Sequence, residues 1–344
     1  MASALLAPSS WFGCRIGVNI AIPSAHRPSR AVITRRQLLK GAVALGVGSA
    51  SFGGYALAEP YRLNVTRYNL TPPGWPADLA LRVAVIADLH ICEPWMNLDR
   101  VRRIVARTNA LAPDVILLLG DYVAGYRMSR FSRHVPHDDW ARELAALAAP
   151  LGVHAVLGNH DWWDEIEVQR RRSGPTRAGD ALERAGLKLY ENDVLRLEKN
   201  GRGFWLAGLG DQWAFWPKPE DYASFKARGK IDYEGVHDLA GTLAKVTDDA
   251  PVILIAHEPD IFPQVPARVS LTLSGHTHGG QVNLFGFTPV VPSKYGSRYV
   301  YGHIVEDARH LIVSGGLGCS ALPIRFGAPP EIVAIELGGA ATVS

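Results

Sequence analysis

The feature that most constrains the fold of this chain is an alternation of short apolar runs with amphipathic segments. Apolar runs of strand length cover residues 81–88, 114–121 and 153–159. Segments with helical spacing of apolar residues follow at 98–111 and 138–150, and another is predicted at 178–186. Strands that alternate with helices and read as continuous apolar runs are typical of α/β proteins, where they are buried on both faces. The pattern therefore predicts an α/β fold.

The second half of the chain differs, because predicted strands follow one another more closely. The only long helical pattern there covers residues 233–246. This spacing favours either one mixed sheet or two stacked sheets. No linker-like composition interrupts the chain after residue 60, so a single domain is predicted over residues 59–344. The strands predicted in this half are 187–191, 194–198, 204–210, 251–257, 269–276, 310–316 and 331–337.

Residues 1–58 are predicted to be a twin-arginine export signal. Arg35 and Arg36 come shortly before a Gly/Ala-rich apolar run that ends in Ala56-Leu57-Ala58, a cleavage site of the A-x-A type. The usual pattern has Phe where this chain has Leu38. The predicted partner is the twin-arginine export machinery, and the predicted location is the periplasm or the outer face of the membrane. An uncleaved N-terminal anchor is the alternative.

The basic charge of the chain belongs to this segment. The chain of 344 residues has 36 Lys and Arg against 33 Asp and Glu, a net charge of +3. Residues 1–58 contribute six of the basic residues and no acidic ones, so 30 basic residues remain against 33 acidic ones. A nucleic-acid partner is therefore not expected, since such domains carry a basic excess.

Polar side chains follow five of the predicted strands, at the point where each strand ends. The carboxyl ends of strands in an α/β sheet face a common crevice, where ligands bind. Imidazole and carboxylate ligands together suit Zn, Fe or Mn, and two such ions can clamp a phosphoryl group during in-line displacement. The candidate residues in chain order are Asp88, His90, Asp121, Asn159, His160, Asp161, His257, His276 and His278.

The spacing of the last two histidines has its own prediction. Residues i and i+2 of an extended strand point to the same side. His276 and His278 are therefore expected to present their imidazoles to one space from the end of one strand. In a two-metal site, this strand end would serve both ions.

The order of these motifs resembles the five-block signature of the calcineurin-like metallophosphoesterases. The blocks are Asp-x-His, Gly-Asp, Gly-Asn-His-Asp, His and Gly-His-x-His, and all five are present between Asp88 and His278. The stretch GLGCSALPIRFGAPPEI, residues 316–332, resembles the C-terminal part of the exported bacterial subgroup. The resemblance implies a four-layer α/β/β/α sandwich of two mixed sheets flanked by helices.

The resemblance also implies a role for each candidate residue. Two transition-metal ions, divalent or trivalent Mn, Fe or Zn, would be the cofactors. One ion would be held by Asp88, His90 and His278, the other by Asn159, His257 and His276, and Asp121 would bridge them. His160 would donate a proton to the leaving oxygen, and Asp161 would orient His160. A hydroxide between the metals would attack phosphorus.

The predicted activity is hydrolysis of a phosphodiester or phosphomonoester. Export favours a cell-envelope or phospholipid-like substrate, and peripheral contact with the membrane is left open. Aromatic residues near the motifs, among them Trp95, Trp162, Trp163 and the segment 211–225, either pack the loops or grip such a substrate. A nucleotide or protein phosphatase on the same centre and a non-catalytic metal-binding envelope protein are the alternatives. The presence of His160 and Asp161 argues against the last of these.

Overall fold

The computed structural model describes residues 51–218 and 233–339. The first sheet contains β1 (Asn64–Leu70), β2 (Leu81–Ile86), β4 (Val115–Leu118), β6 (Val153–Ala155), β7 (Lys188–Leu189) and β14 (Glu331–Leu337). The second contains β8 (Asp193–Lys199), β9 (Arg202–Gly208), β10 (Val252–Ile255), β11 (Leu271–Ser274), β12 (Gly302–Glu306) and β13 (Arg309–Val313). A two-stranded ribbon pairs β3 (Cys92–Glu93) with β5 (Arg133–His134). The α-helices are α2 (Leu98–Asn109), α3 (His137–Leu144), α4 (Asn159–Trp163), α5 (Ile166–Arg171), α6 (Arg177–Arg184) and α8 (Leu239–Ala244).

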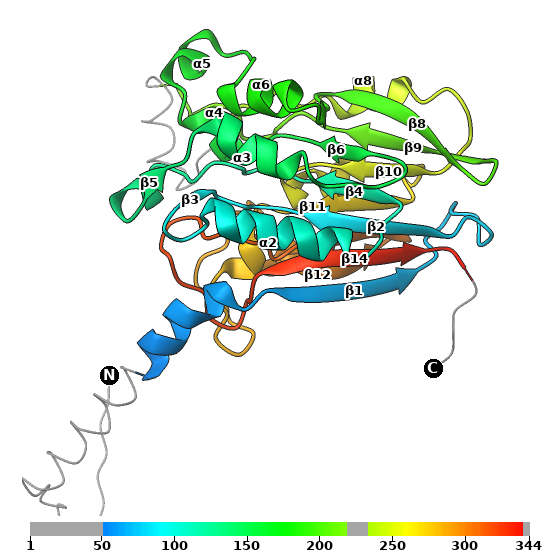
Figure 1. The fold of residues 1–344 in the computed structure, drawn as a ribbon. Helices are drawn as coiled ribbons and strands as arrows, with labels where there is room; N and C mark the ends of the chain where they lie inside the picture. The colour runs from blue at the N-terminus through cyan, green and yellow to red at the C-terminus, as the bar shows by residue number, and fades with distance from the viewer. Residues whose placement is uncertain (1–50, 219–232, 340–344) are drawn as a thin grey trace, which may run out of the picture. The chain divides into compact units, whose positions relative to one another are not determined.

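Both six-stranded sheets are mixed. The strand order is β1-β14-β2-β4-β6-β7 in the first sheet and β12-β13-β11-β10-β9-β8 in the second. In the first sheet β14 runs antiparallel to β2, and in the second β12 and β8 run antiparallel to their neighbours. The remaining pairs are parallel, and Figure 1 shows α2, α3 and α6 along the same side of the first sheet.

The layers follow from the alternation of side chains along the buried strands. On β2, Ala84 and Ile86 pack with the helices, whereas Val83 and Val85 face the second sheet. On β10, Ile253 and Ile255 face the first sheet, whereas Val252 and Leu254 pack with the 3₁₀ helix η4 (Pro259–Gln264) and α8. Each fully buried aliphatic side chain of this kind contributes about 1.5–3 kcal/mol. The predicted four-layer α/β/β/α architecture is therefore confirmed.

Several elements differ from the sequence prediction at the margins of the fold. The edge strands β1 and β12 were not predicted, because their side chains are only partly buried and lack a continuous apolar run. The helix predicted over 233–246 is only α8. Its start is set by Asp238, whose carboxylate accepts the Gly241 N–H and so caps the helix. The helix predicted over 138–150 ends at Leu144.

Residues 51–58, the last part of the predicted signal, are helical and contact the segment after β13. The Phe52 ring stacks on Phe326 with centroids 4.4 Å apart, and the Ala56 carbonyl accepts the Arg325 N–H at 3.0 Å. Ala56 itself is buried. Residues 1–50 lie outside the described part of the chain, and cleavage after Ala58 stays a prediction. Within the described residues, no helix is long and apolar enough to cross a membrane.

Candidate metal centre

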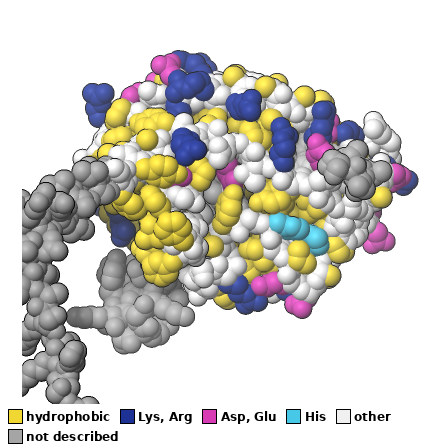
Figure 2. Space-filling model, turned by 90° about the horizontal axis from the view of Figure 1, so that it is seen from below, with side chains coloured by type: hydrophobic (Ala, Val, Ile, Leu, Met, Phe, Trp, Pro, Cys, Tyr) yellow, Lys and Arg dark blue, Asp and Glu magenta, His cyan; other side chains and the backbone are white. Residues whose placement is uncertain are grey.

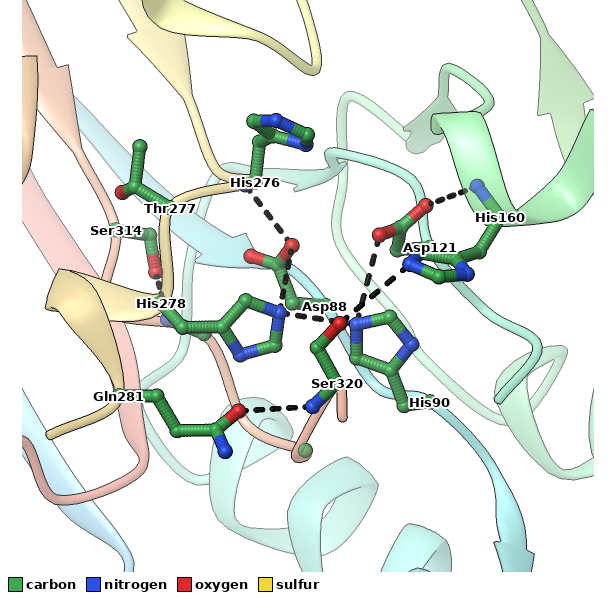
Figure 3. Close-up of polar contacts among 12 residues, drawn as sticks. Asp88, His90, Asp121, His160, His276, Thr277, His278, Gln281, Ser314 and Ser320 are labelled. Carbon is green, nitrogen blue, oxygen red and sulfur yellow. Dashed lines mark hydrogen bonds and ion pairs between the residues drawn. The ribbon is translucent and has the colours of Figure 1, made fainter. Parts of the chain in front are cut away.

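The ends of β2, β4, β6, β10 and β11 lead into loops that bring the candidate residues together. Asp88, Asp121, Asn159, His257 and His276 are all buried, although each follows a different strand. Figure 3 shows Asp88, His90, Asp121 and His278 converging with His276 nearby. Residues up to 190 positions apart in the chain thus meet at one edge of the two sheets, as the sequence predicts.

Two groups of side chains have ligand atoms close enough to hold a metal ion. One group is Asp88, His90, Asp121 and His278, and the other is Asp121, His257 and His276. Within each group all ligand atoms lie within 4.8 Å of one another. Asp121 belongs to both groups. Its Oδ2 lies 3.3 Å from His257 Nε2 and 3.5 Å from His90 Nε2, so a single carboxylate oxygen faces both groups.

Unpartnered polar atoms in this site fit a cationic occupant. Asp88 Oδ2, Asn159 Oδ1 and His276 Nε2 are buried, and among the described residues they have no hydrogen-bond partner. Bare ring nitrogens also face one another: His90 Nε2 lies 3.0 Å from His278 Nε2, and His276 Nδ1 lies 3.3 Å from His257 Nε2. Buried polar groups are normally paired, so such a cluster needs a cation to satisfy it.

Carbonyl oxygens fix the orientation of two of the histidines. His90 Nδ1 donates to the Val123 carbonyl at 3.0 Å, and His257 Nδ1 donates to the Leu119 carbonyl at 2.6 Å. A neutral ring that donates from Nδ1 has its lone pair on Nε2, and Nε2 is the atom that faces Asp121 in both cases. This arrangement is the usual support for metal-binding imidazole.

Three of the buried histidines have protonation states that suit metal binding, whereas the Asp121 carboxylate outweighs burial and holds the pKa of His257 well above its usual range. Burial lowers the pKa of His90 to about 3 and lowers the pKa values of His276 and His278 well below their usual range. These rings are therefore neutral at pH 7, the form that binds metal. Burial acts to raise the pKa of Asp121, but the surrounding histidines, led by His257, hold it well below its usual range. Burial raises the pKa of Asp88 to about 7, and a cation beside it would favour the charged carboxylate.

The backbone at the site is strained. Asp88, His90, Asp121, His276 and His278 all have φ between 45° and 70°, in the left-handed region. Non-glycine residues there cost of order 1–3 kcal/mol each, and such strain concentrates at functional sites. The same backbone conformations correct one prediction. His276 and His278 are not on an extended strand, because β11 ends at Ser274 and His278 begins the 3₁₀ helix η5 (His278–Gly280). A tight turn, not strand alternation, sends one ring to each group.

Two glycines make room for the carboxylates. A Cβ on Gly158 would lie 2.4 Å from Asp121 Oδ1 and 2.6 Å from His257 Cε1. A Cβ on Gly275 would lie 2.7 Å from Asp88 Oδ2. Any side chain at either position would therefore displace a candidate ligand, which explains why the motifs contain Gly before Asn159 and His276.

The structure separates the roles of His160 and Asp161. His160 belongs to neither ligand group, and its ring lies at the edge of the site, with Nε2 3.5 Å from Ser320 Oγ. The prediction that Asp161 orients His160 is wrong. Its oxygens accept the backbone N–H groups of Gly158, Asp121, Tyr122 and Val123 at 2.9–3.2 Å. Asp161 therefore ties the loop after β4 to the start of α4.

Two residues missed by sequence reasoning, Ser320 and Arg325, come from the segment after β13. Arg325 is fully buried, donates to the carbonyls of Gly315, Gly318 and Ala328, and approaches His278 Nδ1 at 3.2 Å. Gln281 accepts the Ser320 N–H at 2.8 Å. The stretch 316–332 was recognised only as a resemblance, and an isolated Arg in a loop gives no signal of burial beside a metal site.

The aromatic residues near the motifs divide into two sets. Trp162 is a core residue. Trp163, Trp213, Trp216 and Tyr233 pack against one another, with ring centroids 4.2–5.7 Å apart in the contacting pairs. This cluster borders the site, since Trp213 lies 4.6 Å from the His276 ring and Trp163 lies 5.0 Å from the His160 ring. The part of the segment 211–225 beyond residue 218 lies outside the described residues.

Comparison with known proteins places the chain in a family. The calcineurin-like phosphoesterase family matches residues 81–280. The uncharacterized metallophosphoesterase YkuE of Bacillus subtilis is 29% identical over 89% of this chain and 98% of its own length. Phosphodiesterase YaeI of Escherichia coli is 28% identical over 89% of this chain and 100% of its own. UDP-2,3-diacylglucosamine pyrophosphatase LpxG of Chlamydia trachomatis is 28% identical over 80% of this chain and 89% of its own length. The chain therefore belongs to the calcineurin-like phosphoesterase family and is a metal-dependent phosphoric ester hydrolase.

Proposed function

We propose that the protein hydrolyses a phosphodiester that carries an apolar chain, such as a phospholipid-like molecule of the cell envelope. The observation that carries this proposal is a cavity of 380 Å³ that shares His278 with the metal centre. Pockets of this size hold small molecules and use a few polar groups to orient them. Apolar residues form most of the lining: Val282, Pro289, Val290, Pro292, Ala321, Leu322 and Ile324.

The polar part of the cavity suits the phosphate end of such a substrate. Arg127 and Ser320 line the same cavity, and Ser320 Oγ is the group that lies near His160 Nε2. A phosphoester whose apolar chain fills the cavity would therefore place its phosphate between His278, Arg127 and His160. The names of two relatives, a phosphodiesterase and a pyrophosphatase of a diacylated sugar nucleotide, are consistent with this assignment.

The chain's own residues would divide the chemistry between them. Two transition-metal ions, when bound, supply an activated water near neutral pH and neutralise charge on the phosphoryl oxygens. Asp121 would hold the two ligand groups together, and the strained loops would keep the ligands preorganised. His160 would donate the proton to the leaving oxygen. Burial lowers the pKa of His160, and the negative charge of a bound phosphate would favour its protonated form.

The substrate proposal predicts a dependence on chain length. A p-nitrophenyl alkyl phosphodiester with a dodecyl chain is expected to have a kcat/KM at least about tenfold above that of the methyl analogue, because each buried methylene contributes about 0.8 kcal/mol. The leaving group is the same in both, so chemistry does not differ. The measurement is steady-state hydrolysis below the micelle concentration.

Matched variants test whether the cavity is the cause. Ile324 lines the cavity, so Ile324→Ser should reduce the preference for the dodecyl ester. Val305 is exposed on β12, so Val305→Ser should leave this preference unchanged. Equal kcat/KM for both esters in the wild type, with better hydrolysis of nucleotides or phosphopeptides, would favour a nucleotide or protein phosphatase instead.

We also propose that the chain is exported by the twin-arginine machinery to the periplasm or the outer face of the membrane. Arg35 and Arg36 with the following apolar run support this, and the machinery carries folded proteins that have already acquired their metals. The double variant Arg35→Lys with Arg36→Lys is expected to stay in the cytoplasm. Cell fractionation measures this, and normal export of the double variant would refute the proposal.

A further inference from the structure

A loop beside the metal centre exposes large hydrophobic side chains. Phe285 is 101% exposed, Val290 is 72% exposed and Phe287 is 65% exposed. A single exposed apolar residue is normal on a protein surface, but several side by side mark an interaction site. These three residues lie within six positions of one another in the chain.

Other exposed apolar residues join this loop through Phe326. The Asn283 N–H donates to the Phe326 carbonyl, and the Phe52 ring stacks on the Phe326 ring. Leu322, four residues before Phe326, is also exposed. We define the apolar rim as Phe52, Phe285, Phe287, Val290 and Leu322. The view from below in Figure 2 shows hydrophobic side chains gathered on this face of the molecule.

The rim shares two residues with the cavity that leads to the metal centre. Val290 and Leu322 are exposed and also line that cavity, whose inner wall includes His278. A surface covering the rim would therefore also face the opening to the site.

The charges near the rim select the kind of surface. Residues 51–58, 277–301 and 314–330 contain no Asp or Glu, and Lys294 is exposed in the second of these segments, whereas Arg298 there pairs with Glu306 of β12. Arg127 lies at the cavity. Apolar side chains with basic neighbours and no carboxylates are typical of regions that insert into a bilayer with anionic head groups.

The N-terminal sequence points to the same occupant. Residues 41–50, GAVALGVGSA, are apolar or small and uncharged, and they lead directly into the helical residues 51–58 that contribute Phe52 to the rim. Where residues 1–58 are not cleaved, this apolar sequence immediately precedes Phe52 in the chain.

We propose that the apolar rim docks on the surface of an anionic lipid bilayer, so that the cavity opens toward the lipid. Phe285 and Phe287 would insert below the head groups, while Lys294 and Arg127 would contact lipid phosphates. The proposal concerns binding to a membrane and holds for any phosphoester that the site hydrolyses.

The test measures partition of the full chain onto vesicles of phosphatidylethanolamine and phosphatidylglycerol, three to one, by flotation without hydrolysable substrate. The wild type is expected to float. The double variant Phe285→Ser with Phe287→Ser should lower the partition coefficient by about 10- to 100-fold, because each partly inserted Phe contributes roughly a factor of 3 to 10. Ile166→Ser is the matched control, since Ile166 is 63% exposed and lies on α5, away from the rim.

The outcomes separate the possible occupants. Equal flotation of the wild type and the double variant would show that the rim does not touch the bilayer. An equal loss of flotation in Ile166→Ser would also overturn the proposal, because the loss would then not depend on the rim. Sedimentation without lipid gives the mass of each protein: a dimer that is lost in the double variant would make a second copy the occupant and overturn the proposal. Equal melting temperatures establish that the variants are folded. Because hydrolysis is not the readout, failure here leaves the proposed activity intact.

Discussion

Asp121→Ala is expected to lose both metal ions and to lower kcat by roughly 10³-fold or more, since metal activation of water and charge neutralisation supply several kcal/mol and each 1.36 kcal/mol is a factor of ten. The reason is geometric. Asp121 Oδ2 lies within 3.5 Å of a histidine from each ligand group, so its removal opens both groups at once. Elemental analysis and steady-state kinetics of the purified variants measure the two effects.

Other variants show whether the loss is due to bridging. Asp121 Oδ1 accepts the backbone N–H of His160 at 2.8 Å. A buried backbone N–H that loses its partner costs about 1–3 kcal/mol of stability. Asp121→Asn keeps an acceptor there but removes the charge, so it should fold and still lose metal. His257→Ala should mainly weaken one ion. Asp164 is a nearby exposed carboxylate that belongs to neither ligand group, so Asp164→Ala should retain two ions. Two equivalents bound in Asp121→Ala would refute the bridging role.

The second large effect is expected at His160 and depends on the leaving group. An alkoxide leaves poorly without a proton, whereas p-nitrophenolate leaves readily. General acid assistance is typically worth about 10²–10⁴-fold. His160→Ala should therefore retain both metals, lose activity on alkyl phosphodiesters by about that factor, and lose distinctly less on p-nitrophenyl esters. The measurement is kcat on both substrate types, with metal content determined in parallel.

Asp161 provides the contrast for this experiment. Because its carboxylate accepts four backbone N–H groups, Asp161→Asn should lower the melting temperature and reduce activity on both substrate types to a similar extent. Equal losses on both substrates in His160→Ala with metals retained would assign His160 to phosphate positioning. Loss of metal in His160→Ala would make His160 a ligand.

The sequence predicted the core strands and the meeting of the candidate ligands, and the reason is physical. The apolar runs of β2, β4, β10 and β11 are buried on both faces, so they carry a strong pattern, and their carboxyl ends face one crevice. The edge strands β1 and β12 have one or both faces partly exposed and give a weak pattern. The sequence pattern left two possibilities open, one mixed sheet or two stacked sheets. The structure has two stacked sheets, and the side chains of β2 alternate between the helices and the second sheet.

The details of the site were less predictable because they depend on backbone conformations that the sequence does not announce. The left-handed φ angles at His276 and His278 replaced the expected strand alternation. The role of Asp161 could not be separated from that of His160, since the two are adjacent and both polar. The burial of Arg325 beside His278 depends on the path of residues 314–328, which no periodic pattern predicts.

The central claim is that two metal ions share Asp121, and anomalous diffraction from crystals grown with Mn tests it most directly. Two anomalous peaks about 3.5–4 Å apart are expected on either side of Asp121. One should contact Asp88, His90 and His278, and the other should contact Asn159, His257 and His276. A single peak, or a second ion held by His160 instead of Asn159, would contradict the account.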